Sequence, residues 1–250
     1  MNALSTAFGW VLLLMLLAMV TTWLQRLPVF KLSAIAVQGD VMHNNAVTLR
    51  ANVAPRLAGN FLTVNLAQTR AVFESVPWVR KATVQRQFPD RLKVVLQEHQ
   101  AVAYWGPEGD TRLVNSFGEV FEANQAEVEG NDLPQLNGPA GQALMVLQAY
   151  RLVSTQFDRL DMRIERLELT GQGSWRARFE SGATIEIGHG SLSDIEIRAQ
   201  RFIVTLSQVS SRYGRDLESA DLRYSNGYAL KLKGVTTLNP GDKDDKKVKR

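Results

Sequence analysis

The chain has 250 residues, of which 45% are hydrophobic and 22% are charged, a composition typical of a folded protein rather than a disordered one. It has no cysteine and only three histidines, which excludes disulfides, thiolate metal sites and cysteine nucleophiles and leaves little for a metal centre. The net charge of +4 is too small to indicate binding to nucleic acid. We expect no catalytic residue, cofactor, metal, small-molecule substrate or nucleic-acid partner.

The charges divide the chain into four parts. Residues 1–25 carry no charged side chain, and residues 26–105 have ten basic and four acidic residues, a net charge of +6. Residues 106–240 have fourteen basic and eighteen acidic residues, a net charge of −4, and residues 241–250 have five basic and three acidic residues. We interpret these parts as an uncharged anchor, a basic domain, an acidic domain and a charged tail.

The uncharged run from Ala3 to Leu24 predicts a transmembrane helix. About 20 apolar residues, at roughly 1.5 Å each, span the hydrocarbon core of a bilayer. Trp10 and Trp23 lie toward the two ends of the run, where indole rings favour the membrane–water interfaces. A cleaved signal peptide is the alternative, but the run is long for one and has no basic residues before it. Arg26 and Lys31 follow the span, which alone would favour a cytoplasmic C-terminal bulk, although this tendency is weak for long domains.

Residues 32–102 predict a compact domain with the order strand, helix, helix, strand, strand. Asn65 and Gln68 have the spacing of a capping box, in which the Asn side chain accepts from the free N–H groups of the second helix. Two helices on a three-stranded sheet leave no deep cleft, so we expect no catalytic site here. The expected strands are 32–39, 78–88 and 92–99, and the expected helices are 45–57 and 65–76.

Residues 103–233 predict a second domain, rich in strands, with helices packed on an antiparallel sheet. Ser193 and Glu196 form a second capping box, followed by apolar residues at helical spacing. Ser225-Asn226-Gly227 is typical of a hairpin turn. The expected elements are a hairpin at 113–121, a helix opening at 133–139 and running to Tyr150, strands at 164–169, 175–179 and 184–187, a helix at 193–213, and strands at 221–224 and 228–233.

Several stretches resemble the FtsQ family of bacterial cell-division proteins. The run from Val76 to Leu92 is similar to the "PWV…A.V.R..P..L" stretch of that family's POTRA domain. Later stretches match "LVN..G.VF", "LP.L.GP.G" and "DLRY..G.A", the last from Asp221 to Ala229, while Gln100 stands where proline is usual. The resemblance implies an α+β fold: one N-terminal transmembrane helix, a POTRA-like βααββ domain and a β-rich domain.

The resemblance also implies a place in the cell. Members of the family are single-pass proteins of the inner membrane at the division septum, with a cytoplasmic N-terminus and the bulk of the chain in the periplasm. The domain limits expected here are a short cytoplasmic N-terminus at 1–6, a transmembrane helix at 7–25, a POTRA domain at 32–102, an FtsQ-type β domain at 103–233 and a flexible charged tail at 234–250.

The last strand, 228–233, is followed only by coil, so it is a candidate sheet edge to which a partner strand can add. Its two lysines are also a common device against such pairing, and periodicity alone leaves both interpretations open. The resemblance favours binding: it implies a divisome scaffold that recruits FtsB by strand addition, together with FtsL and other divisome membrane proteins. The contact residues it implies are Arg201, Arg223, Tyr224, Asn226, Gly227, Tyr228, Ala229, Leu230, Lys231 and Leu232.

Two other classes of function are weaker alternatives. A POTRA-containing factor for outer-membrane assembly or secretion would predict several POTRA domains and a barrel, whereas this chain has one such domain. A membrane-tethered periplasmic hydrolase would need a catalytic cluster, and the pair His189 and Ser191 lies in a glycine-rich turn that does not by itself build a triad.

Overall fold

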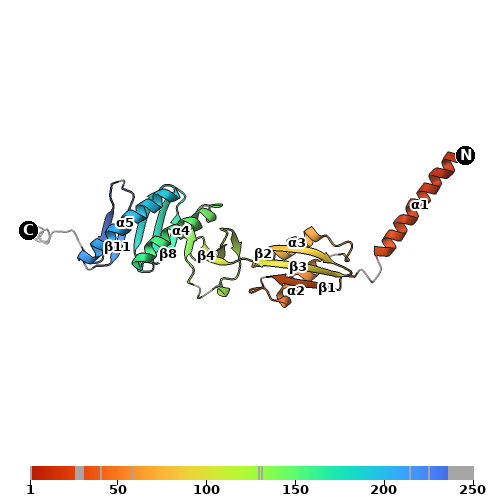
Figure 1. Cartoon of the computed structure of the whole chain (residues 1–250), viewed down its shortest axis with the longest axis horizontal. Coiled ribbons are helices and arrows are strands. Elements are labelled where there is room, and N and C mark those ends of the chain that lie inside the picture. The colour runs from red at the N-terminus through yellow and green to blue at the C-terminus, as the bar shows by residue number, and fades with distance from the viewer. Residues whose placement is uncertain are drawn as a thin grey trace, which may run out of the picture. The chain divides into compact units, whose positions relative to one another are not determined.

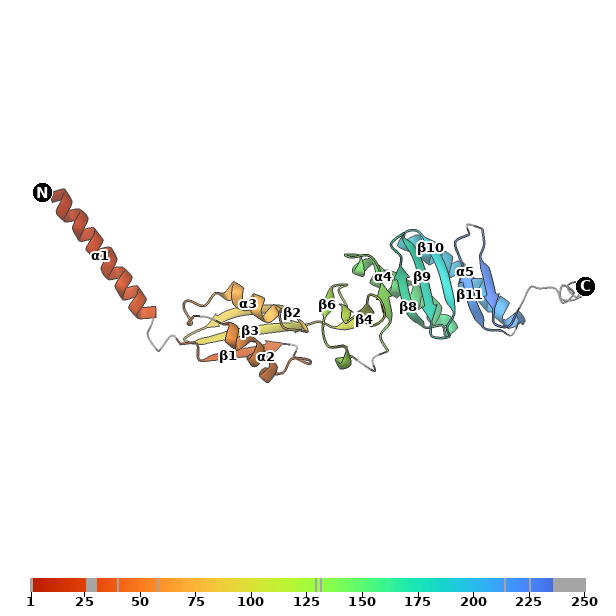
Figure 2. The ribbon, with the colours of Figure 1, turned by 180° about the vertical axis from the view of Figure 1, so that it is seen from behind.

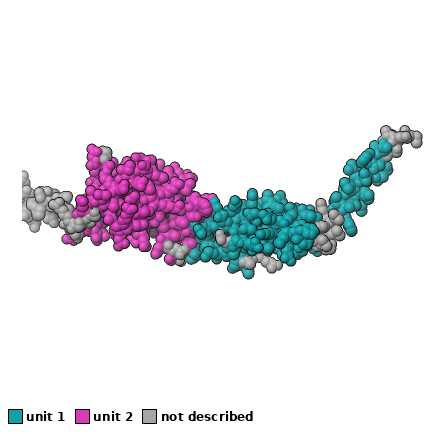
Figure 3. Space-filling view, in the orientation of Figure 1, with its two compact units in different colours: residues 1–100, 122–127 teal, residues 101–121, 128–250 magenta. Residues whose placement is uncertain are grey.

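The computed structural model of the chain describes residues 2–25, 31–39, 41–57, 59–128, 130, 132–213, 215–224 and 226–235. It divides into two compact units, residues 1–100 with 122–127 and residues 101–121 with 128–250 (Figure 3). The predicted fold class, an apolar N-terminal helix followed by a βααββ domain and a β-rich domain, is confirmed (Figure 1). The predicted tail at 234–250 lies outside the described residues from residue 236 onward.

The first element is the helix α1, Asn2–Gln25. Within it, the window Thr6–Trp23 has a mean hydropathy of 1.8, and none of it is buried in the structure. Its side chains, Trp10 and Trp23 among them, are therefore available to another apolar phase. The helix is long and apolar enough to cross a membrane.

The rest of the first unit has the predicted order of strand, helix, helix, strand, strand. Its three-stranded sheet has the order β1-β3-β2, with β1 parallel and β2 antiparallel to the central strand β3. The predicted cap is present, since Asn65 Oδ1 accepts from the N–H groups of Ala67 and Gln68 at 3.0 and 3.1 Å. The elements are β1 (Ala34–Gly39), α2 (Ala46–Val53), a 3-10 turn (Ala54–Arg56), α3 (Leu66–Glu74), β2 (Val79–Gln87) and β3 (Arg91–Glu98).

In the second unit the described strands form a nine-stranded sheet of order β12-β11-β10-β9-β8-β7-β4-β5-β6 (Figure 2). The strands are β4 (Ala101–Trp105), β5 (Arg112–Asn115), β6 (Val120–Glu122), β7 (Gln135–Asn137), β8 (Ile164–Leu169), β9 (Ser174–Phe179), β10 (Thr184–His189), β11 (Leu217–Asp221) and β12 (Ala229–Leu232). The α-helices are α4 (Ala143–Phe157) and α5 (Leu192–Tyr213).

The expectation of a purely antiparallel sheet is wrong, because the sheet is mixed. The pairs β4–β7, β7–β8 and β10–β11 are parallel. The physical reason lies in the connections, since a helix between two neighbouring strands returns the chain to the end where the first strand began. Helix α4 separates β7 from β8 in this way, and α5 separates β10 from β11.

Three element limits in this unit also differ from the prediction. The expected helix opening at 133–139 is the strand β7, since Pro134 and Pro139 disfavour helical backbone in the residues before them, and α4 begins at Ala143. The expected strand at 221–224 is wrong: β11 occupies 217–221. Helix α5 begins at Leu192, one residue before the expected box, because the reciprocal cap joins Ser191 to Asp194. The Asp194 Oδ2 accepts from the Ser191 N–H at 2.8 Å.

Both helices of this unit pack against one face of the sheet (Figure 2). A series of contacting aromatic rings lies in the core between them. Phe157 of α4 meets Phe179 of β9 edge-on, with ring centroids 4.9 Å apart, and lies 6.4 Å from Phe202 of α5. Phe202 in turn meets Tyr228 at 5.0 Å and 88°. Burial of these rings fixes the segment that leads into β12, so the core positions the edge of the sheet.

Candidate partner-binding edge

Strand β12 lies at one edge of the nine-stranded sheet and pairs with β11 in antiparallel register. The Lys233 N–H donates to the Asp216 carbonyl at 2.9 Å and so points toward β11. Because N–H directions alternate along a strand, the N–H groups of Leu230 and Leu232 point to the opposite side. No other strand of the described residues pairs with that side. The predicted edge is therefore present, with backbone groups directed outward.

The side chains of β12 alternate between the core and the outer face. Leu232 is buried and Leu230 packs against the core, while Ala229 and Lys231 are exposed. The Lys231 Nζ forms an ion pair with Glu218 Oε1 at 2.5 Å, across the pair of strands. Only the backbone and the exposed side chains of this strand are thus accessible to a partner.

Tyr228 anchors the start of the strand. Its hydroxyl lies 2.5 Å from the Thr205 Oγ1 of α5, and its ring is partly buried. This phenol therefore helps to hold β12 to α5, and the contact role expected for Tyr228 stays a prediction.

The connection from β11 to β12 carries further predicted contact residues. Arg223 forms a bidentate ion pair with Asp221, with Nε–Oδ1 and Nη2–Oδ2 distances of 2.9 and 2.6 Å. The hydrogen bond from Arg223 is the main reason that the pKa of Asp221 is lowered. Gly188 lies directly beneath, because a Cβ there would stand 2.8 Å from Arg223 Cγ. Asn226 is exposed and Gly227 is partly buried.

Two predicted residues meet at a shallow depression of about 200 Å³ beside this connection. Arg201 of α5 and Tyr224, whose side chain is 59% exposed, both line it. The exposed phenol ring and the nearby guanidinium suit a surface that binds protein, since these side chain types often dominate interface energies. The structure thus brings together two residues that are 23 positions apart in the sequence.

Sequence reasoning missed the rest of the depression, which consists of Asp194, Ile197 and Arg198. With Arg201 these residues have the spacing i, i+3, i+4 and i+7, which places them on one face of a helix. That spacing was the available signal. Arg198 also donates to the carbonyls of Ile187 and His189, at 3.1 and 2.5 Å, and so ties this face of α5 to the end of β10.

The candidate hydrolase pair does not form a catalytic arrangement. Ser191 Oγ lies 2.8 Å from Asp194 Oδ2, within the cap of α5. Hydrogen bonds from Ser191 are the main cause of the lowered pKa of Asp194. The serine oxygen is therefore committed to capping a helix. Among the described residues, no cluster of three or more histidine, aspartate or glutamate side chains could hold a metal ion.

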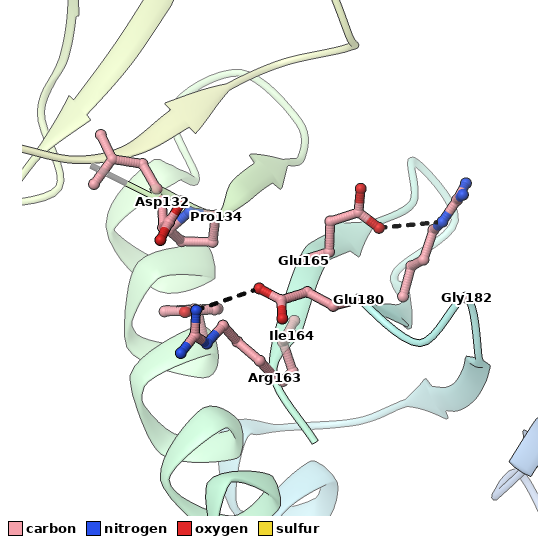
Figure 4. A pocket seen from close by; sticks show the side chains of 10 residues that line it. Asp132, Pro134, Arg163, Ile164, Glu165, Glu180 and Gly182 are labelled. Atoms are coloured by element: carbon pink, nitrogen blue, oxygen red, sulfur yellow. Dashed lines mark hydrogen bonds and ion pairs between the residues drawn. The ribbon is translucent and has the colours of Figure 1, made fainter. Parts of the chain in front are cut away.

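A larger pocket, of about 420 Å³, lies between α4 and β8–β9 and contains none of the predicted residues (Figure 4). Four of its five charged side chains form two ion pairs: Arg163 Nη1 lies 3.5 Å from Glu180 Oε1, and Arg178 Nε lies 3.4 Å from Glu165 Oε2. Burial is the main cause of the raised pKa of Tyr150, which lines the same pocket. Because both arginines of the pocket already pair with carboxylates, the pocket offers an anionic ligand less than its size suggests.

Comparisons with known proteins agree over both units. Residues 30–99 match the family described as POTRA domain, FtsQ-type, and residues 103–223 match Cell division protein FtsQ/DivIB, C-terminal. The second match ends before β12.

Relatives named Cell division protein FtsQ align over much of the chain. The relative from Thiomonas arsenitoxydans is 40% identical over 94% of this chain and 87% of its own length. The relative from Burkholderia pseudomallei is 38% identical over 98% and 97%, and the one from Vibrio cholerae is 32% identical over 82% and 75%. With a matching POTRA domain, a matching C-terminal domain and relatives of this identity, the chain belongs to the FtsQ family of cell division proteins.

Proposed function

We propose that this chain is a non-catalytic scaffold of the divisome, which links membrane-anchored division proteins and helps to control septum assembly. In this proposal β12 and its neighbouring depression bind FtsB and FtsL, with FtsB adding a strand to the sheet. The contact set remains Arg201, Arg223, Tyr224, Asn226, Gly227, Ala229 and Lys231, with Tyr228, Leu230 and Leu232 contributing backbone rather than side chain. The observation that carries the proposal is the unpaired side of β12 within the described residues.

The edge has the properties that strand addition requires. Outward N–H groups at Leu230 and Leu232 give a partner strand its hydrogen bonds, while the inward side chains hold β12 to the core. Lys231, which would protect the edge as a free charge, is paired with Glu218. The strand is therefore rigid and its open side is accessible, which lowers the entropic cost of adding a second chain.

The anchor and the domain limits complete the proposal. Helix α1 crosses the inner membrane once, with residues 1–6 in the cytoplasm, 7–25 in the bilayer and the remainder in the periplasm at the division septum. The POTRA domain, 32–102, makes membrane-proximal contacts, the β domain, 103–233, recruits partners, and 234–250 form a charged tail. The exposed apolar surface of Thr6–Trp23 supports the membrane assignment.

Topology has a direct test. A fusion of alkaline phosphatase to the C-terminus is expected to be active in cells, because that enzyme folds only in the oxidising periplasm. A fusion that is expressed but inactive would place the bulk of the chain in the cytoplasm and contradict the scaffold proposal.

Replacing Tyr224 by alanine is expected to weaken binding of a purified periplasmic segment of FtsB by roughly 30-fold, the about 2 kcal/mol typical of an interfacial tyrosine. Because the ring is exposed, the domain should remain folded. The measurement is a titration of the full chain in nanodiscs with the labelled segment. The matched control is Phe117→Ala, which removes another exposed aromatic ring of the same unit that lies outside the depression. Equal affinities for the Tyr224 variant and the native chain would contradict the interface.

A further inference from the structure

The turn between β2 and β3 lies at the end of the POTRA sheet where the chain enters from α1. The Ser33 N–H donates to the Asp90 carbonyl at 3.0 Å, and Ala34 pairs with Arg91 in the first position of the parallel register. Figure 2 shows this end of the sheet, where β1 begins beside the hairpin of β2 and β3. The turn and the entry point are therefore neighbours within one folded domain.

Chain length limits how far this end can be from the end of α1. Helix α1 ends at Gln25, and Ser33 follows eight residues later. Eight fully extended residues span at most about 29 Å. If α1 crosses the membrane, this end of the POTRA domain is thus held within about one bilayer thickness of the lipid surface.

This end of the domain carries two exposed apolar side chains, Leu62 and Phe88, which we call the apolar tip. Phe88 is 79% exposed and Leu62 is 42% exposed. The buried Phe61 connects them, because its ring contacts the Phe88 ring edge-on at 6.3 Å. Two apolar side chains exposed side by side, with a buried ring between them, form a small apolar patch of the kind that can bind a lipid surface or a partner.

Arg86 holds the apolar tip in place. Its Nε donates to the Phe61 carbonyl at 2.8 Å and its Nη2 to the Val64 carbonyl at 2.7 Å. These bonds fasten the loop that bears Leu62 to the strand that ends next to Phe88. The two apolar side chains therefore stand on a rigid frame rather than on separate loops.

Basic residues flank the apolar tip. Lys31 and Arg91 are both exposed, and Lys31 precedes Ser33 by two residues. Asp90 is the acidic residue of the turn, with its Oδ1 3.9 Å from Arg91 Nε. Exposed aromatic and aliphatic side chains beside lysine and arginine are the pattern that lies in the headgroup region of anionic membranes.

We propose that Leu62 and Phe88 insert into the interfacial region of an anionic bilayer, with Lys31 and Arg91 facing the lipid phosphates. This would fix the orientation of the POTRA domain to the membrane. The inference rests on the proposed function in one respect: α1 must span that bilayer.

The test is fluorescence quenching in nanodiscs, for which the chain is suited because it has no cysteine. Full-length variants Phe88→Cys, Lys81→Cys and Met15→Cys each receive one dye, in discs whose lipids carry a spin label near the headgroup. Lys81 is the matched control, since it is exposed on the same strand as Arg86 and six residues from Gln87, about 20 Å along the strand. In discs containing phosphatidylglycerol we expect the dye at 88 to be quenched at least threefold more than the dye at 81.

Two further arms separate the possible outcomes. Spin labels placed deep in the acyl chains should quench the dye at 15, which reports the anchor. Quenching at 15 with equal quenching at 88 and 81 would overturn this inference and leave the anchor intact, whereas no quenching at 15 would overturn both. Substituting both Lys31 and Arg91 by glutamine should halve the quenching at 88 or lower it further. Undiminished quenching in that variant, or in phosphatidylcholine discs, would overturn the assignment to anionic lipid.

Discussion

Replacing Leu230 by proline is expected to reduce the affinity of the chain for an FtsB segment at least 30-fold, or by about 2 kcal/mol or more. Proline has no N–H, and its ring would occupy the space where the partner strand must approach. The Leu230 N–H points away from β11, so the substitution leaves the bonds between β11 and β12 in place. Titration of the nanodisc-embedded chain with the labelled segment measures the loss.

The matched control is Leu230→Ala, which removes the same side chain from the core but keeps the backbone donor. We expect the alanine variant to bind within about threefold of the native chain, because strand addition depends on backbone groups. Circular dichroism should show both variants folded. Equal loss of affinity in the two variants would mean that Leu230 acts through packing, and it would contradict strand addition at this edge.

The elements that sequence predicted well are those whose local signals agree with their tertiary surroundings. Asn65 caps α3 as expected, and β9 alternates between core and solvent along its length. The last strand lies at the edge of the sheet, as predicted. Such signals depend on a few neighbouring residues, so the sequence alone is enough to detect them.

Other elements depend on partners distant in the chain. Strand β7 has three residues, too few for a period to be detected, and it exists because β4 and β8 pair with it on either side. In β11 the register shifts between Leu217 and Ser219, which breaks the alternation that would have marked the strand. The sheet direction depends on the connections rather than on the strands themselves, which is why the parallel pairs were missed.

The candidate site shows the same division. The helical face that bears Arg201 could be predicted from spacing, but its meeting with Tyr224 could not, because it depends on how β11 and β12 place their connection beside α5. The hydrogen bond of Arg198 to the Ile187 carbonyl could not be predicted either, because it depends on how α5 packs beside β10. The cap formed by Ser191 and Asp194 was missed in favour of the neighbouring Ser193 and Glu196. The contacts between α5 and the connection from β11 to β12 are tertiary, so they cannot be predicted from a local sequence pattern.

Glu98, at the end of β3, is expected to be the most sensitive position of the POTRA domain. The buried carboxylate accepts from the N–H groups of Met42, His43 and Asn44 at 2.9, 3.0 and 3.0 Å, and from Asn44 Nδ2 at 3.0 Å. His43, which lies against Glu98 through Nδ1 at 3.2 Å, stacks on Trp78 with ring centroids 3.9 Å apart. One carboxylate thus organises residues 42–44 in the connection between β1 and α2.

Replacing Glu98 by alanine is expected to lower the free energy of unfolding of this domain by about 3 kcal/mol, since several donors would lose their acceptor inside the fold. A small domain has only a few kcal/mol of stability, so a substantial part of it would be lost. Hydrogen exchange of the full chain, followed by mass spectrometry, should show loss of protection at residues 41–45. Retained protection there would contradict the role given to the carboxylate.

The same carboxylate should make the domain sensitive to acid. Burial alone would raise the pKa of Glu98, but hydrogen bonds from His43 and Asn44 outweigh it and leave the pKa below its usual value of 4.5. A carboxyl with a lowered pKa in the folded state stabilises the fold above the usual pKa, and this contribution is lost as the pH falls through the folded pKa. Protection of residues 41–45 should therefore decrease below about pH 4.5. Glu98→Gln cannot titrate, so its protection should be lower throughout and lack this pH dependence. Since His43 also faces the carboxylate, the difference between the two chains isolates Glu98, and identical pH profiles would show that other groups control acid unfolding.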